Sequence, residues 1–72
     1  MKNRYFIVFY NGNSINQSHY GYIGEHRTDG KYINKDDISK SIIRLNPQLI
    51  NATTSNIIEL NESDYNQFFG NI

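Results

Sequence analysis

The chain has 72 residues, no cysteine, and seven basic residues that balance seven acidic ones. A chain of this length forms one small domain with a thin core, and the lack of cysteine excludes disulfide bonds and thiolate metal sites as a means of stabilising it. Zero net charge argues against general attachment to nucleic acid, for which an excess of basic residues is expected. The sequence shows neither a secretion leader nor an apolar run of about 18 residues, so we expect a soluble, cytoplasmic protein without a cofactor.

Two β segments are predicted in the first half of the chain. The run RYFIVFY is rich in aromatic and β-branched residues and is followed by the turn-forming sequence NGNS, which predicts a strand over residues 5–10 and a turn over residues 11–14. A second β segment is expected at about residues 19–28, paired antiparallel with the first because the connection is short and polar. Residues 28–30 form a predicted turn, and residues 31–33 are either a short strand or the approach to a helix.

The first predicted helix begins after Asn34. Two aspartates follow shortly behind this asparagine, which is typical of an N-cap with acidic residues in the first helical turn. Ile38, Ile42 and Leu45 then recur at helical spacing, so they should form the apolar stripe of the helix. Pro47 ends the pattern, because proline is not tolerated in a helix interior.

A third strand and a second helix are predicted in the remainder of the chain. The sequence TTSNIIEL is β-branched enough for a strand, in which Ile58 and Leu60 face one way and Ile57 the other. Asn61 is expected to cap a short helix that ends at the glycine near the C-terminus. The aromatic residues of this helix lie on one stripe: Tyr65, Phe68 and Phe69.

The element order β-β-α-β-α predicts one small α+β domain, residues 1–72, with a three-stranded, mostly antiparallel sheet and both helices on one face. Four helix side chains are the predicted cover for that face: Ile38, Ile42, Leu45 and Phe68. The first strand is apolar on both sides, which is unusual for a sheet with one solvated face. We therefore expect Phe6, Val8 and Tyr10 to contact another chain, in a homo-oligomer or with a partner.

The second β segment carries the richest set of binding groups. Tyr20, Tyr22 and His26 alternate onto one face, and Arg27 and Lys31 follow closely. Tyrosines offer stacking surfaces, and basic side chains hold anions, so this segment is a candidate site for a small anionic, nucleotide-like ligand or for a few bases of a single strand.

The two glycines of the second β segment have two interpretations. Gly21 and Gly24 could allow a ligand to approach the backbone closely, or they could mark close packing within the protein, with the tyrosines shielding them. The sequence leaves both open.

Metal binding and catalysis find little support in the sequence. His19 and His26 stand seven positions apart, so they do not meet on one face of a strand, and a metal site needs three or four converging ligands. Ser18, His19, Glu25 and Asp29 are present without a nucleophile elbow, a phosphate loop or a paired-carboxylate spacing. We expect no enzyme activity and no metal.

Four stretches together, YFIVFY, GYIG, KYINKDDI and NIIELNESDYNQFF, resemble small accessory proteins encoded by phages and mobile elements of low-GC bacteria. The eleven asparagines and eleven isoleucines fit an AT-rich coding sequence. The resemblance implies a stoichiometric inhibitor or sequestering protein that acts against host or defence components in the host cytoplasm.

The leading hypothesis is therefore a non-enzymatic binding protein that captures a host protein or a small anionic ligand. An alternative is a single-stranded nucleic-acid-binding module that stacks bases on its tyrosines. A third hypothesis, a hydrolase or transferase acting on a small nucleotide, requires a general base that converges with basic residues in a concave site.

Overall fold

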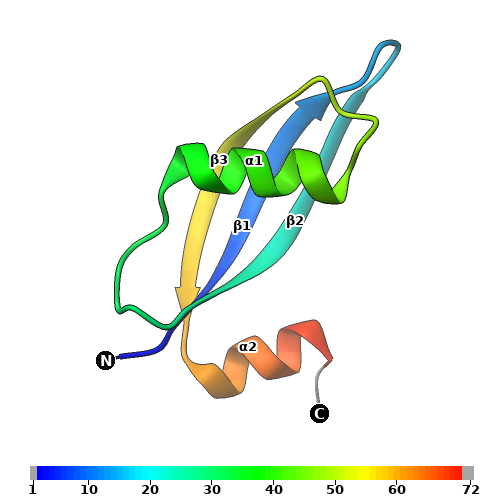
Figure 1. The fold of residues 1–72 in the computed structure, drawn as a ribbon. Coiled ribbons are helices and arrows are strands. Elements are labelled where there is room, and N and C mark those ends of the chain that lie inside the picture. The colour runs from blue at the N-terminus through cyan, green and yellow to red at the C-terminus, as the bar shows by residue number, and fades with distance from the viewer. Residues whose placement is uncertain (1, 71–72) are drawn as a thin grey trace.

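Three β-strands form a single antiparallel sheet with the first strand at its centre (Figure 1). The computed structural model describes residues 2–70. Strands β1 (Arg4–Asn13), β2 (Ser18–Arg27) and β3 (Asn51–Leu60) stand in the order β2-β1-β3, and β1 pairs antiparallel with both neighbours. The predicted α+β class, the three-stranded antiparallel sheet and the element order β-β-α-β-α are confirmed.

The β1–β2 hairpin extends further than the sequence predicts. Residues 11–13, predicted as part of a turn, pair with both β2 and β3 instead, because ladder bonds on two sides satisfy their backbone groups. The chain reverses at residues 14–17, where the backbone amide of Ser14 donates to the carbonyl of Gln17 at 2.9 Å. This turn fixes the register in which Phe9 lies opposite Tyr22.

The two helices begin at the predicted caps. The side chain of Asn34 accepts a hydrogen bond of 3.1 Å from the backbone amide three residues on, and α1 (Lys35–Leu45) follows. The side chain of Asn61 does the same at 2.8 Å for α2 (Glu62–Phe69). Gly70 ends α2 with a φ of 69°, a left-handed conformation that glycine adopts without a steric penalty.

Helix α1 lies across one face of the sheet and forms the core with it (Figure 1). On β1, Phe6 and Val8 are fully buried and Tyr10 is 9% exposed, and the helix residues Ile38 and Ile42 pack against them. Residues before and after the helix complete this core: Ile33 and Leu49. The prediction that Phe6, Val8 and Tyr10 contact another chain is wrong, because α1 and its flanking loops cover this row within the monomer.

Helix α2 packs on the opposite face of the sheet, so the two helices do not share a face as predicted. Its Tyr65 ring lies 5.2 Å from the ring of Tyr5, which points away from α1. The connection from β3 to α2 is the single residue Asn61, and directly after it the helix contacts the face that carries Tyr5 and Gly24. Both faces of β1 are therefore covered at least in part by the same chain.

Two predicted covering residues do not cover the α1 face. Leu45, the last residue of α1, is 63% exposed, and Phe68 lies on α2 at the other face. Helical spacing places Leu45 on the same stripe as Ile38 and Ile42, but a residue at the end of a helix extends past the sheet more easily than one in its middle. The burial is instead supplied by residues outside the helix.

An ion pair joins the central strand to β3. The guanidinium of Arg4 donates to both carboxylate oxygens of Glu59, at 2.9 and 2.7 Å, and also to the carbonyl of Gly30 at 3.2 Å. The hydrogen bond from Arg4 holds the pKa of the Glu59 carboxyl below its usual value. This pair connects the start of β1, the end of β3 and the loop before α1.

The lowered pKa of Glu59 predicts a pH dependence of stability. Because the folded state favours the ionised carboxylate, the unfolded state binds more protons between the lowered folded pKa and its own pKa of about 4.3, so this contribution is present above that upper value and is lost as pH falls through the folded pKa. We expect the free energy of unfolding of the Glu59→Gln variant to fall less between about pH 5 and pH 3 than that of the wild type, measured by urea unfolding.

The Arg4→Gln variant provides the matched control for this experiment. It leaves the carboxyl group in place but removes the donor that lowers its pKa, so its pH dependence should resemble that of Glu59→Gln. A wild-type slope retained in Arg4→Gln would show that another group carries the effect.

Candidate functional site

The sheet face opposite α1 carries the predicted tyrosines. Because side chains alternate along a strand and the register pairs Tyr22 with Phe9 and His26 with Tyr5, one face gathers residues from all three strands. We call it the tyrosine face. Its members are Tyr5, Ile7, Phe9, Asn11 and Asn13 of β1, Ser18, Tyr20, Tyr22, Gly24 and His26 of β2, and Asn51, Thr53, Asn56, Ile58 and Leu60 of β3.

Helix α2 covers only one end of the tyrosine face. The rings of Phe68 and Phe69 approach Tyr22 at 5.4 and 6.2 Å, and nothing in residues 2–70 lies over the half toward the hairpin. There Tyr20 is 78% exposed and Tyr22 is 53% exposed. Five of the apolar side chains that remain half-buried or exposed here are called the tyrosine patch: Phe9, Tyr20, Tyr22, Ile58 and Phe68.

A shallow hollow lies in the tyrosine patch. It has a volume of about 400 Å³ and is lined by Phe9, Tyr20 and Tyr22, together with Asn11 and Ser55. The Phe9 and Tyr22 rings lie 5.9 Å apart and form part of its wall. The hollow is large enough for one or two side chains of another molecule.

The tyrosine face has no lysine, arginine, aspartate or glutamate in the three described strands. Only His26 can carry a charge on it. The residues around the patch toward the hairpin are amides and hydroxyls instead: Asn11, Asn13, Asn51, Thr53 and Asn56. Since phosphate groups are held chiefly by cationic side chains, this face lacks the groups that would bind a nucleotide or a nucleic-acid backbone.

The structure does not bring Arg27 and Lys31 together with the tyrosines. Arg27 alternates to the α1 face, where it donates to both carboxylate oxygens of Asp29, at 3.2 and 2.6 Å. This bond raises the pKa of Arg27 and lowers that of Asp29. Lys31 lies in the loop beyond, where its backbone amide donates to the same aspartate. The predicted recognition rim is therefore divided between two faces of the sheet.

His26 lies at the covered end of the tyrosine face. Its ring stacks on Tyr5 with the ring centroids 4.4 Å apart and the planes inclined by 15°. Burial, and secondarily the carboxylate of Glu62, raises the pKa of the Tyr5 hydroxyl. His26 thus belongs with the α2 contacts and is separate from the exposed pair Tyr20 and Tyr22.

The two glycines of β2 serve close packing inside the chain. A Cβ atom on Gly24 would lie 2.5 Å from the hydroxyl oxygen of Tyr65 and 2.9 Å from Cζ of Phe69. A Cβ atom on Gly21 would lie 2.6 Å from the hydroxyl oxygen of Tyr10 on the other face. Of the two interpretations that the sequence leaves open, packing explains both positions.

Sequence reasoning did not identify Phe9, Ile58 and Phe68 as members of an exposed site. Their place in it depends on the register, which the turn at residues 14–17 sets, and on α2 crossing to the far face. A hairpin loop placed at those four residues would have paired Phe9 with Tyr22 and so could have revealed half of the patch.

Neither metal binding nor a known family offers a further assignment. Among residues 2–70 no group of three or more histidine, aspartate or glutamate side chains is placed to hold a metal ion. In the same residues no helix is long and apolar enough to cross a membrane. Comparison with protein-family models, curated proteins and solved structures finds no match to this chain.

Proposed function

We propose that the chain is a non-enzymatic binding protein that captures another protein on the tyrosine patch. The observation that carries the proposal is the group of exposed aromatic and aliphatic side chains on a sheet face without lysine, arginine, aspartate or glutamate. Protein interfaces combine an apolar, aromatic core that is depleted in charged residues with a polar, solvent-accessible rim. The patch and its border of amides and hydroxyls have this composition.

The chemistry of the patch suits a protein partner energetically. Tyrosines bury a large area with few rotatable bonds and often provide most of the binding energy of an interface. Desolvating amides and hydroxyls costs less than desolvating unpaired charges, so the border of the patch does not oppose association. Capture of this kind is stoichiometric, as it is for an inhibitor or sequestering protein of a host or defence component.

The anionic ligand and the single-stranded nucleic acid fit this surface less well. Aromatic rings can stack on bases, but the nearest charged residues of α2 are the acids of its first turn, Glu62 and Asp64, which repel phosphate. We therefore propose a protein as the binding partner and expect no salt-dependent binding of short oligonucleotides.

A double substitution, Tyr20→Ser with Tyr22→Ser, tests the proposal. We expect the wild type, immobilised and exposed to a lysate of cells that express the gene, to retain a protein partner in a fixed ratio that native mass spectrometry measures. The double variant should bind the isolated partner at least about tenfold more weakly, because two exposed aromatic anchors are lost.

Ile15→Ser is the matched control, because Ile15 is an 86% exposed apolar residue in the hairpin loop, outside the patch. It should bind the partner as the wild type does. Equal binding by the double variant, or capture of oligonucleotides that weakens with added salt, would contradict the proposal.

A further inference from the structure

Within residues 2–70, the outer edge of β3 pairs with no other strand. β3 has a neighbour on one side only, and its ten residues contain no proline and no lysine, which natural proteins use to block sheet edges. Its one ionisable residue, Glu59, is held by Arg4. The other edge strand, β2, carries Glu25 and Arg27 near its end. Of the two edges, β3 is the one more open to an added strand.

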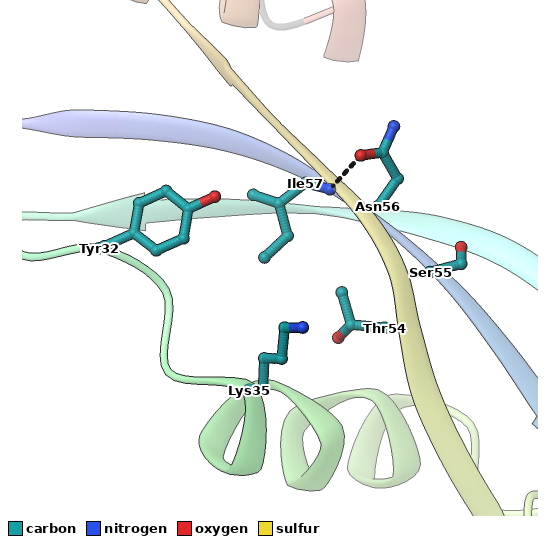
Figure 2. A pocket seen from close by; sticks show the side chains of 6 residues that line it. All are labelled: Tyr32, Lys35, Thr54, Ser55, Asn56 and Ile57. Atoms are coloured by element: carbon teal, nitrogen blue, oxygen red, sulfur yellow. Dashed lines mark hydrogen bonds between the residues drawn. The ribbon is translucent and has the colours of Figure 1, made fainter.

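A groove runs beside this edge (Figure 2). It has a volume of about 370 Å³ and lies between β3 and the segment that leads into α1. The residues that line it are Tyr32 and Lys35 on one side and Thr54, Ser55, Asn56 and Ile57 on the other. An irregularity in the pairing with β1 leaves Ser55 without a partner residue, so the strand bends at the groove.

Within residues 2–70, two polar side chains at the groove lack a partner, and one backbone amide beside them is bonded only to a neighbouring side chain. Figure 2 shows the amine of Lys35 directed toward β3, and within residues 2–70 this lysine forms no ion pair. The hydroxyl oxygen of Thr54 is buried without a hydrogen bond. The backbone amide of Ile57 donates at 2.9 Å to the side chain of the preceding Asn56.

We propose that an extended segment of a partner protein adds to the free edge of β3 and places an acidic side chain in this groove against Lys35. Main-chain hydrogen bonds to an exposed sheet edge supply affinity in this mode of recognition, and a pocket beside the edge supplies specificity. The acidic side chain matches the unpaired charge of Lys35. A polar atom entering the groove also gives the Thr54 hydroxyl a partner, which removes the cost of an unsatisfied buried group.

A second copy of the chain fits this edge less well than a single strand. Two-fold pairing of β3 with its own copy would bring two α1 helices to the same face of the joined sheet, each with its leading segment over the seam. The one ionisable residue that β3 of a second copy would bring to this edge is Glu59, which Arg4 already binds, so a second copy offers no free acidic side chain to Lys35. The inference does not depend on the tyrosine patch, which lies on the other face of the sheet.

A random decapeptide library selected against the immobilised full chain tests the inference. We expect enriched peptides to contain an aspartate or glutamate. The binding of one synthetic enriched peptide should weaken about fivefold in Lys35→Ala and stay unchanged in Lys40→Ala, an exposed lysine further along the same helix. Two further peptides carry methyl groups on their backbone nitrogens, one at the odd and one at the even residues. One of them should bind about tenfold more weakly and the other nearly as well as the unmethylated peptide, because only alternate amides face β3.

Several results would overturn the inference. They are a selection without enrichment, equal weakening in the two methylated peptides, and equal binding of the peptide to the two lysine variants. A dimer in sedimentation equilibrium that the peptide does not dissociate would also overturn it. The variant with both Tyr20→Ser and Tyr22→Ser should bind the peptide as the wild type does. Loss of peptide binding at β3 and loss of partner binding at the tyrosine patch can therefore be told apart.

Discussion

Replacing Phe6 with alanine is expected to lower the free energy of unfolding by about 3–5 kcal/mol. The side chain is fully buried under α1, so its loss removes apolar surface and leaves a cavity between the sheet and the helix. A domain of this size has a total stability of only about 4–11 kcal/mol. The variant should therefore be marginally folded or unfolded at room temperature.

Urea unfolding at several protein concentrations measures this effect and tests the position of Phe6. A residue buried within one chain gives a loss of stability that is independent of concentration, whereas a residue at a self-association surface does not. Phe6→Leu, which leaves a smaller cavity, should lose about 1 kcal/mol and so keeps the comparison measurable if the alanine variant does not fold.

Phe68→Ala is the matched control, since it removes the same atoms from a ring that is 49% exposed on α2. We expect it to cost much less than Phe6→Ala. Equal losses in the two variants would mean that α1 does not shield Phe6 as the structure indicates.

The elements of this fold follow from local features of the sequence. Asn34 and Asn61 predict the starts of the two helices, because their side chains accept hydrogen bonds from backbone amides that have no partner within the helix. Gly70 ends α2 because glycine adopts positive φ readily. The aromatic and β-branched residues of β1 predict a strand, because such side chains are enriched in β-sheets. Each signal acts within a few residues, so the sequence alone contains it.

The faces of the sheet do not follow from the sequence in the same way. Both sides of β1 are apolar, and the pattern does not say which side meets α1. If both helices covered the same face of the sheet, the other face of β1 would have no cover, and our prediction places Phe6, Val8 and Tyr10 on that uncovered face. The connection at Asn61 reverses that outcome, because it takes α2 to the other side and leaves α1 free to bury this row.

The candidate site shows the same division. Tyr20 and Tyr22 are exposed on one face, as alternation predicts, but the partners of these tyrosines depend on the register and on the reach of α2. Alternation also sends Arg27 to the opposite face, where Asp29 binds it. Because Tyr20, Tyr22 and Arg27 are close in sequence, they are predicted to form one binding site. The alternation of side chains along β2 instead places Arg27 on the face opposite the tyrosines.

Replacing Gly24 with valine is expected to lower the free energy of unfolding by about 2–3 kcal/mol and to release α2 from the sheet. Even a Cβ atom at this position would lie within 3.0 Å of Tyr65 and Phe69, the two residues that hold α2 on the tyrosine face. Helix α2 has no fully buried residue, so it has few other contacts to keep it in place. The loss should be limited to the energy with which α2 docks.

Hydrogen exchange measures whether the loss is local. In Gly24→Val the amides of α2 should exchange faster while those of α1 keep their protection, because α1 packs on the other face. Gly21→Ala is the matched control on the same strand. Its Cβ presses on Tyr10 beneath α1, so it should destabilise the domain without selective exposure of α2. Faster exchange in both helices for both variants would contradict separate packing of the two faces.

Helix α2 also sets the limit of the proposed binding surface. It covers Tyr5 and Gly24 and reaches Tyr22 through Phe68, so the part of the patch beyond Tyr22 toward the hairpin is outside its contacts. Release of α2 in Gly24→Val would extend the apolar surface toward the covered end of the face, and we expect this variant to bind a hydrophobic dye that the wild type binds weakly. A variant that binds the partner normally but exposes α2 would place the binding energy at the hairpin end of the sheet, on Tyr20 and Tyr22, which residues 2–70 leave exposed.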